Sequence, residues 1–343
     1  LKYMYSFCND YSEGAIPMIM ERLQEFNKKQ NPGYGMDEIC DKAREKIQEV
    51  LQCPTCDIHF LVGGTQANLT VIASALRPYE AVMAADSGHI NVHETGAIEA
   101  SGHKVVIVDS ADGKVSVEGI YEEVRRHCDE HMVKPKMVYI SDATELGSVY
   151  RKAELQALRK TCDALGLYLF MDGARLGCAL TASDNDVSFA DLCKYIDVFS
   201  IGGTKNGALF GEAVVIVNEQ LKKDFRYMIK QRGGMLAKGW LLGLQFLSLF
   251  EDDQYRKIAA HANAMAQKLQ TAFVDCGYSL FAKSSTNQIF VILPNEVIKK
   301  LEKEYAFQFW EKEDATHTAM RFVTSWATPE AVIDEFITYL KQI

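Results

Sequence analysis

Residues 197–207 read DVFSIGGTKNG, an apolar strand that leads into a turn of small residues around Lys205. Small neighbours allow a bulky ligand to approach the backbone closely. A lysine that is partly removed from water has a lowered pKa and readily bonds to a carbonyl carbon. Taken alone, Lys205 is also consistent with a surface lysine, so the flanking sequence has to supply the context.

Strand and helix patterns alternate on both sides of this stretch. The predicted strands cover 58–62, 81–84, 104–108, 136–141, 167–171, 198–201 and 212–218, and helices are predicted at 65–76, 89–101, 117–131 and 152–165. Several of these strands are apolar on both faces, which predicts an α/β fold with a mainly parallel, doubly covered sheet. Such sheets bind ligands at the carboxyl ends of their strands, where the unusual residues of this chain fall.

Residues 168–175 read YLFMDGAR and place Asp172 at the end of a buried strand. A buried carboxylate is costly unless it has a cationic partner. One such partner is the protonated ring nitrogen of pyridoxal phosphate, which needs an acid there to remain an electron sink. The alternative is an ion pair with Arg175.

Residues 60–68 read FLVGGTQAN, a strand, a glycine turn and a helix start. Backbone N–H groups and the helix dipole make such a turn an anion site, and Thr65 adds a hydroxyl. Taken alone, this glycine turn is weak evidence for an anion site. Its pattern is neither the GxGxxG of dinucleotide-binding folds nor the GxxxxGKS/T of P-loops.

His89 follows another strand, where it would stack on a flat ring or move protons. His93 lies one helical turn further on, so the two histidines offer a zinc alternative. The glutamate of HExxH and a third ligand are missing, so we expect no metal.

The combination of DGAR (172–175) with GTKNG (203–207) resembles the threonine aldolases of the β-eliminating-lyase group, PLP fold type I. The likeness extends from FCND (7–10) to RFVTS (321–325). It implies the aspartate-aminotransferase-like fold, with a large, mainly parallel seven-stranded sheet domain and a small C-terminal α+β domain. We expect an N-terminal segment at 1–14, the large PLP-binding domain at 15–245 and the small domain at 246–343. We expect a continuous helix at 241–273 to lead into the small domain. That domain is expected to contain strands at 288–293 and 320–324 and a helix at 328–342.

The resemblance also implies roles for individual residues. Lys205 would bind pyridoxal phosphate covalently, Asp172 would pair with its ring nitrogen, and His89 would stack on the ring and take part in catalysis. The phosphate would lie at Gly64, Thr65 and Gln66. The family's phosphate-binding arginine is replaced by Leu236, so the nearby Arg232 or Lys238 is expected to supply that charge.

The substrate carboxylate is expected between Arg175, which would also border the cofactor, and Arg321. Asn9 occupies the place of a serine that touches this carboxylate in many relatives. Glu145, in ATELG (143–147), replaces a histidine near the substrate hydroxyl. Tyr34 matches a loop that reaches the site of a partner subunit, so a homodimer or homotetramer with shared sites is expected.

These features predict an aldolase that cleaves L-threonine, L-allo-threonine or related β-hydroxy-α-amino acids to glycine and an aldehyde. β-Elimination or transamination of a small amino acid is the nearest alternative, and a non-catalytic protein that keeps the cofactor as a ligand is a more distant one.

Composition excludes other classes of function. The formal net charge of −9 argues against nucleic-acid and anionic-membrane partners. Nine scattered cysteines, including the pair Cys53 and Cys56, indicate a reducing compartment. Residues 1–9 show no signal-peptide pattern, and no apolar stretch reaches the length of a membrane span, so a cytoplasmic location is expected.

Overall fold

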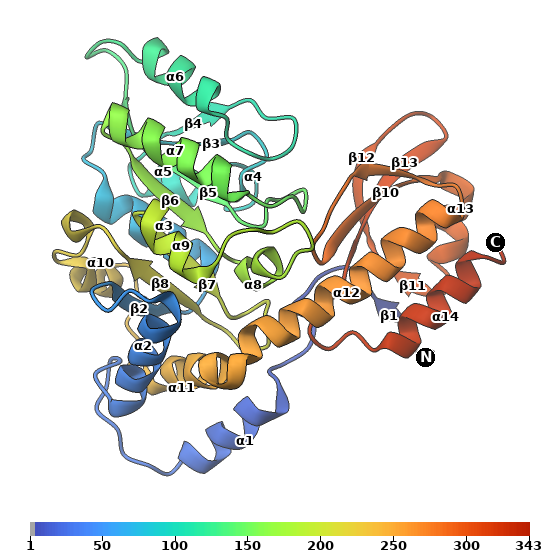
Figure 1. The fold of residues 1–343 in the computed structure, drawn as a ribbon, viewed down its shortest axis with the longest axis horizontal. Coiled ribbons are helices and arrows are strands. Elements are labelled where there is room, and N and C mark those ends of the chain that lie inside the picture. Colours follow the sequence, from blue (N-terminus) through green and yellow to red (C-terminus); the bar gives the residue numbers. More distant parts are fainter. Residues whose placement is uncertain (1–3) are drawn as a thin grey trace.

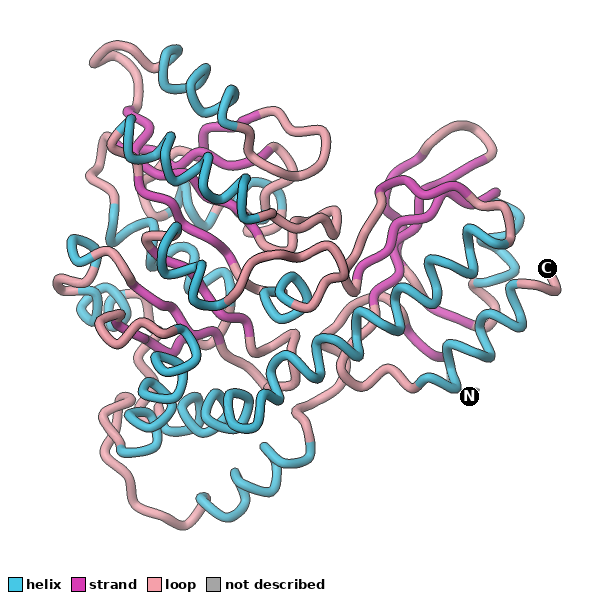
Figure 2. Tube along the Cα trace, viewed as in Figure 1, coloured by secondary structure: helices cyan, strands magenta, loops and turns pink. Residues whose placement is uncertain are grey.

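The computed structural model describes residues 4–343 and contains two main sheets that are linked by a long helix (Figure 1). Residues 1–3 of the predicted N-terminal segment lie outside the described residues. Figure 2 shows the strands of the large sheet with helices on both sides, and the small sheet as a separate group beside the far end of the helix.

The large sheet has seven strands, as predicted. They are β2 (Asp57–Leu61), β3 (Glu80–Ala85), β4 (Val105–Val108), β5 (Lys134–Ser141), β6 (Tyr168–Asp172), β7 (Val198–Gly202) and β8 (Glu212–Ile216). Their order is β2-β8-β7-β6-β5-β3-β4. Strand β8 pairs antiparallel with both β2 and β7, and the remaining pairs of this sheet are parallel. The predicted α/β class and the mainly parallel sheet are therefore confirmed.

Two apolar cores cover the two faces of this sheet because its strands are apolar on both sides. Val214 and Ile216 of β8 enter one core, and Ala213 and Val215 enter the other. The first core is closed by α3 (Gly64–Ala75), α5 (Ala97–Ala100) and α10 (Phe225–Gln231). The second is closed by α2 (Glu38–Leu51), α6 (Val117–Arg126), α7 (Lys152–Leu165), α9 (Phe189–Tyr195) and α11 (Trp240–Phe250).

Two of the predicted helices are broken in the structure. The predicted helix 89–101 is divided into α4 (His89–Val92) and α5, because Thr95 and Gly96 have φ values of 52° and 76°. The predicted helix 241–273 is divided into α11 and α12 (Gln254–Asp275), because Asp252 and Asp253 have φ values of 51° and 58°. Residues with positive φ end right-handed helices, and the first break turns Glu94 into the interior, where it is 4% exposed.

The C-terminal part is built on a four-stranded antiparallel sheet in the order β12-β13-β10-β9. Its elements are β9 (Ser279–Ala282), β10 (Gln288–Pro294), α13 (Asn295–Leu301), β12 (Gln308–Lys312), β13 (His317–Val323) and α14 (Glu330–Leu340). The chain's beginning joins this part, because β1 (Tyr5–Ser6) pairs with β11 (Tyr305–Ala306) and Phe7 packs against Phe322 and Phe336. The remaining elements are α1 (Pro17–Phe26), α8 (Leu176–Leu180) and the single turns η1 (Glu219–Leu221) and η2 (Glu251–Asp253).

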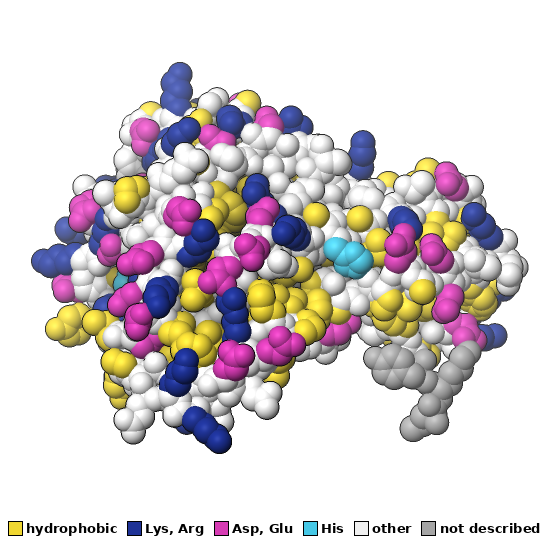
Figure 3. All heavy atoms as spheres, turned by 60° about the horizontal axis from the view of Figure 1, so that its bottom comes forward, with side chains coloured by type: hydrophobic (Ala, Val, Ile, Leu, Met, Phe, Trp, Pro, Cys, Tyr) yellow, Lys and Arg dark blue, Asp and Glu magenta, His cyan; other side chains and the backbone are white. Residues whose placement is uncertain are grey.

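The face of the molecule in Figure 3 carries Lys and Arg side chains interspersed with Asp and Glu. Among residues 4–343, no helix has both the length and the apolar character needed to cross a membrane.

Candidate active site

A cavity of about 240 Å³ lies at the edge of the large sheet where the parallel strands end. Side chains and turns from six places in the fold line it: the β2–α3 turn, the start of α4, the end of β5 with the loop after it, the end of β6 with the turn after it, the turn after β7 and the start of β8. The structure thus brings together seven of the residues that the sequence singled out, which are Gly64, Thr65, His89, Glu145, Asp172, Arg175 and Lys205. Glu212 also lines the cavity.

Lys205 is half-buried, and its amine has no hydrogen bond or ion pair with any residue of the part 4–343. Burial lowers the pKa of this amine, and the nearby Arg175 guanidinium lowers it further. The carboxylates of Asp10, Glu145 and Asp172 act in the opposite direction but do not prevail. The result is an amine that gives up its proton more readily than an ordinary lysine, as covalent catalysis requires.

Asp172 ends β6 and is 4% exposed. Its Oδ2 accepts hydrogen bonds from Asn68 Nδ2 at 2.8 Å and from the Tyr139 hydroxyl at 2.6 Å, and its Oδ1 accepts one from the Ala174 N–H at 2.9 Å. Burial acts to raise the pKa of Asp172, but the His89 charge and these donors outweigh it and lower the pKa. Asp172 is therefore held as a carboxylate that faces the cavity.

Arg175 pairs with Asp10 instead of Asp172, so the alternative of an Asp172–Arg175 ion pair is wrong. Arg175 Nε lies 2.7 Å from Asp10 Oδ2, and Nη2 lies 3.0 Å from Oδ1. Asp10 also accepts from Asn287 Nδ2 at 2.9 Å. Asp10 is distant from Arg175 in the sequence. The sequence predicted no role for it, although it ends the FCND stretch (7–10). Arg175 borders the cavity with its charge already matched.

His89 is oriented by Glu94, which the sequence analysis missed. His89 Nδ1 lies 2.8 Å from Glu94 Oε1, and Asn68 Nδ2 donates to both Glu94 and Asp172. Burial alone would lower the pKa of His89, but the hydrogen bond to Glu94 and the charges of Glu145 and Asp172 raise it. The ring centroids of His93 and His89 lie 5.5 Å apart, and the Nδ1 atom of His89 is hydrogen-bonded to Glu94. The only sequence signal for Glu94 was its place near the end of a supposed helix.

The change Glu94→Gln is expected to lower the pKa of His89, because the buried hydrogen-bond partner that raises it is replaced by a neutral amide. Proton NMR of the imidazole during a pH titration measures this directly. Glu99→Gln, on the exposed side of α5, is the matched control and should leave the titration in place. An unchanged His89 titration in Glu94→Gln would show that Glu94 does not control this imidazole.

Two predicted ligands are directed away from the cavity. The Gln66 amide donates to the Arg232 carbonyl at 3.2 Å, and its Oε1 accepts from the Val62 N–H at 3.3 Å. The Asn9 side chain accepts from Tyr11 N–H and the Ser12 hydroxyl, both at 2.9 Å. Local hydrogen bonds occupy both side chains in this structure. The expected contacts of Gln66 with the cofactor phosphate and of Asn9 with the substrate stay predictions.

Arg321 and Glu145 lie on an adjoining open groove of about 760 Å³, which also reaches Arg175, His89 and Lys205. Glu145 borders both the cavity and the groove. Arg321 donates to Gln288 Oε1 at 3.0 Å and also to Gln308, while its Nε is buried without a partner among residues 4–343. The groove therefore brings the guanidinium groups of Arg175 and Arg321 and the carboxylate of Glu145 next to the lysine.

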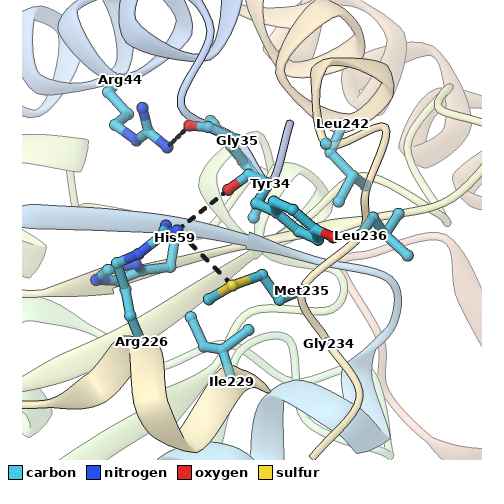
Figure 4. A pocket seen from close by; sticks show the side chains of 12 residues that line it. Tyr34, Gly35, Arg44, His59, Arg226, Ile229, Gly234, Met235, Leu236 and Leu242 are labelled. Atoms are coloured by element: carbon cyan, nitrogen blue, oxygen red, sulfur yellow. Dashed lines mark hydrogen bonds between the residues drawn. The ribbon is translucent and has the colours of Figure 1, made fainter. Parts of the chain in front are cut away.

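Tyr34 lies in a different cavity, between α10, α11 and the edge strand β2 (Figure 4). The backbone of its turn is held by Arg226, which donates to the Tyr34 carbonyl at 3.3 Å, and by Arg44, which donates to Gly35 at 2.6 Å. Leu236 lines the same cavity. Within one chain Tyr34 does not reach the Lys205 site, and the expected contact of Tyr34, Arg232 or Lys238 with a partner subunit's site stays a prediction.

The residues present fit pyridoxal phosphate. The reactive amine of Lys205 and the carboxylate of Asp172 line one cavity, which matches the aldehyde and the ring nitrogen. The helix α3 begins at this cavity behind Gly63, which provides no side-chain cap, and a Cβ at Gly63 or Gly64 would meet nothing within 4 Å. Open space before uncapped N–H groups suits a phosphate.

Asp142, which precedes the Glu145 loop, is 2% exposed, and burial raises its pKa to about 8. The folded protein therefore keeps a proton that the unfolded chain releases near pH 3.8. The contribution of Asp142 to folding stability is therefore greatest at low pH and falls as pH rises towards 8.

The change Asp142→Asn should remove this loss of stability. Its stability relative to the parent should grow by about 1.4 kcal/mol per pH unit between pH 5 and pH 7. Urea unfolding at both pH values measures this gain, and the exposed Asp184→Asn is the control. Equal pH dependence in Asp142→Asn and the parent would contradict it.

Comparisons with known proteins agree with the geometry. The family model described as "Beta-eliminating lyase" matches residues 11–296. A low specificity L-threonine aldolase of Pseudomonas sp. is 32% identical over 340 residues, which cover 98% of this chain and 97% of that protein. The solved Leishmania major threonine aldolase has a TM-score of 0.98 and 46% identity, covering 98% and 99% of the two chains. A Thermus thermophilus aspartate aminotransferase, at 15% identity, a TM-score of 0.71 and coverage of 99% and 91%, shares the fold. The predicted fold type I architecture is thereby confirmed, and the chain belongs to the beta-eliminating lyase family.

Proposed function

We propose that this protein is a pyridoxal-phosphate-dependent aldolase that cleaves L-threonine, L-allo-threonine or related β-hydroxy-α-amino acids to glycine and an aldehyde. The observation that carries the proposal is the unpartnered Lys205 amine in one cavity with a hydrogen-bonded, ionised Asp172. The threonine aldolases named above support the substrate class, since they match nearly the whole chain.

The bound cofactor supplies an electron sink for the electrons of a broken substrate bond. Lys205 would hold it covalently, Asp172 would keep its ring nitrogen protonated, and Gly64 and Thr65 would receive its phosphate. His89, fixed by Glu94, would lie against the ring. The structure already holds the Asp172 and His89 side chains in place by hydrogen bonds, so little ordering of these two is left for the binding step.

The substrate carboxylate would lie near Arg321, whose buried Nε lacks a partner, with Arg175 beside it. Arg321 and Arg175 would hold the carboxylate and thereby fix the orientation of the substrate bond that is to be broken. Because Asp10 already balances the Arg175 charge, Arg321 provides the main attraction.

The hydroxyl proton of the substrate would pass to Glu145, which borders both the cavity and the groove. His89 is less suited to receive it, because its pKa is raised and its ring tends to keep a proton. We therefore assign His89 to stacking and to holding a proton at the ring, and Glu145 to base catalysis.

One steady-state experiment tests the proposal. The purified protein is supplied with pyridoxal phosphate and offered L-threonine, L-allo-threonine and phenylserine, and glycine and the aldehyde are both measured. Equal amounts of glycine and aldehyde are expected. L-Serine and an α-keto acid are offered in parallel, because β-elimination would yield pyruvate and ammonia, and transamination would yield a new amino acid. Either of these products in place of glycine would overturn the aldolase assignment.

We further propose a homodimer or homotetramer in the cytoplasm. The exposed Tyr34, Met36 and Tyr227 near the Arg226 cavity support association, since exposed apolar side chains favour subunit contacts. Nine free cysteines, five of them buried, support a reducing compartment.

A further inference from the structure

Two neighbouring residues of the C-terminal part, Asn287 and Gln288, reach the two arginines that border the open groove. Asn287 Nδ2 donates to Asp10 Oδ2 at 2.9 Å, and the same oxygen accepts from Arg175 Nε at 2.7 Å. Gln288 Oε1 accepts from Arg321 Nη1 at 3.0 Å. Asn287 directly precedes β10 and Gln288 begins it, so one short stretch of backbone places both contacts.

The stretch that carries these two amides is buried and held on several sides. Asn287 is 1% exposed and Gln288 is 0% exposed. The Asn287 amide also donates to the Thr324 carbonyl at 2.8 Å, just after the end of β13. Gln267 of α12 donates to two backbone carbonyls of residues 284–286, at 3.2 and 3.1 Å. Residues 284–288 are therefore fixed between the linking helix and the small sheet (Figure 1).

The two arginines need fixed partners because they carry like charges beside the same groove. Burial and the charge of Arg175 lower the pKa of Arg321, so the two guanidinium groups act on each other. Like charges in a partly buried site repel. A carboxylate gains most from two guanidinium groups when their spacing is set before it binds. Asp10 offsets the charge of Arg175, but an untethered Asp10 would let that guanidinium move.

Each of the two amides keeps one polar atom unpaired. Asn287 Oδ1 and Gln288 Nε2 are buried without a hydrogen-bond partner among residues 4–343. A buried unpaired polar atom is costly, so packing alone would favour apolar side chains at both positions. The contacts with Asp10 and Arg321 explain why amides stand here despite that cost.

We propose that Asn287 and Gln288 are positioning residues, which hold Arg175 and Arg321 at the spacing that the carboxylate of an amino acid requires. Asn287 acts on Arg175 through Asp10, and Gln288 acts on Arg321 directly. Neither amide lines the cavity or the groove, so both act through the arginines. The inference rests on the proposed function, because it requires a groove that receives a substrate carboxylate.

The test uses the full-length protein with bound pyridoxal phosphate and two probes, glycine and methylamine, which differ only in the carboxylate. The absorbance of the cofactor during a titration measures the affinity for each probe. The parent should bind glycine more tightly than methylamine. In Asn287→Ala the affinity for glycine should fall about tenfold, a loss typical of one hydrogen bond to a charged group, while the affinity for methylamine should stay.

The matched control is Asn263→Ala. Asn263 is also buried, its Nδ2 donates to the Cys178 carbonyl at 2.8 Å and to the Thr181 hydroxyl at 3.0 Å, and its Oδ1 has no partner among residues 4–343. It does not line the groove. Urea unfolding should show a similar loss of stability in both variants, but Asn263→Ala should keep the parent affinities for both probes.

The same ratio of glycine to methylamine affinity in Asn287→Ala and the parent would overturn the proposal. If Asn287→Ala does not fold, Gln288→Glu carries the test, because a glutamate has nearly the shape of Gln288 and would neutralise Arg321. Its affinity for glycine should then fall by more than about tenfold with methylamine binding retained, and unchanged glycine binding overturns the proposal. A parent that does not prefer glycine would remove the carboxylate site of the proposed function, and the inference with it.

Discussion

The change Lys205→Ala is expected to abolish covalent binding of pyridoxal phosphate and to lower kcat/KM for L-threonine by more than about 10³-fold. Loss of one acid–base group costs up to about 10⁴-fold, and this variant also loses the covalent attachment. The fold should persist, because the Lys205 amine makes no hydrogen bond or ion pair within residues 4–343. The absorbance of the lysine-bound cofactor, after removal of free cofactor, and aldehyde release are the two measurements.

The control for this change is Lys160→Ala, on the exposed side of α7. It should leave both the absorbance and the rate as they are in the parent. A Lys205→Ala protein that still gives the absorbance of lysine-bound cofactor would assign the covalent role to another residue and remove the basis of the mechanism.

The change Asp172→Asn is expected to lower kcat/KM by roughly two to three and a half orders of magnitude. Asp172 is the buried anion that would face the cofactor's ring nitrogen. Removal of one partner of a buried charge pair costs about 3–5 kcal/mol, at about 1.4 kcal/mol per tenfold in rate. The amide also turns a donor towards Asn68 and Tyr139, which both donate to Oδ2. Steady-state kinetics at saturating cofactor measure the loss, and thermal unfolding reports the local mismatch separately.

Asp163→Asn offers the same chemical change on an exposed turn of α7, where the carboxylate pairs with Arg159 at 2.8 Å. Its kinetics should match those of the parent. If Asp172→Asn retained more than a tenth of the parent kcat/KM, the ring nitrogen would not depend on this carboxylate.

The sheet and its connections followed from apolar strands that alternate with helices, because each strand of a parallel sheet is buried on both faces. The breaks in helices did not follow. Asp252 and Asp253 adopt positive φ without the glycine that usually signals such a conformation, and Gly96 beside Thr95 was read as part of a continuous helix. The short strands of the C-terminal part, such as β9 and β12, were missed because an exposed edge strand needs no apolar run.

The cavity residues could be foreseen where a motif placed them directly after a strand, as for Asp172 and Lys205. Residues that hold the cavity side chains in place could not be foreseen. Asp10 pairs with Arg175, Glu94 with His89 and Tyr139 with Asp172, and no local sequence pattern encodes these partnerships. Gln66 stands within the glycine turn that the sequence singled out, yet its side chain donates to the backbone carbonyl of Arg232.

The pairing of β1 and Phe7 with the C-terminal part has a consequence for how the chain folds during synthesis. Phe7 is synthesised long before Phe322 and Phe336, yet it packs against both. The contacts of Asp10 are likewise incomplete until Asn287 has been synthesised. Contacts between sequence-distant residues form late because they require the largest loop closure. The Arg175 side of the pocket is therefore finished only after translation has passed Asn287.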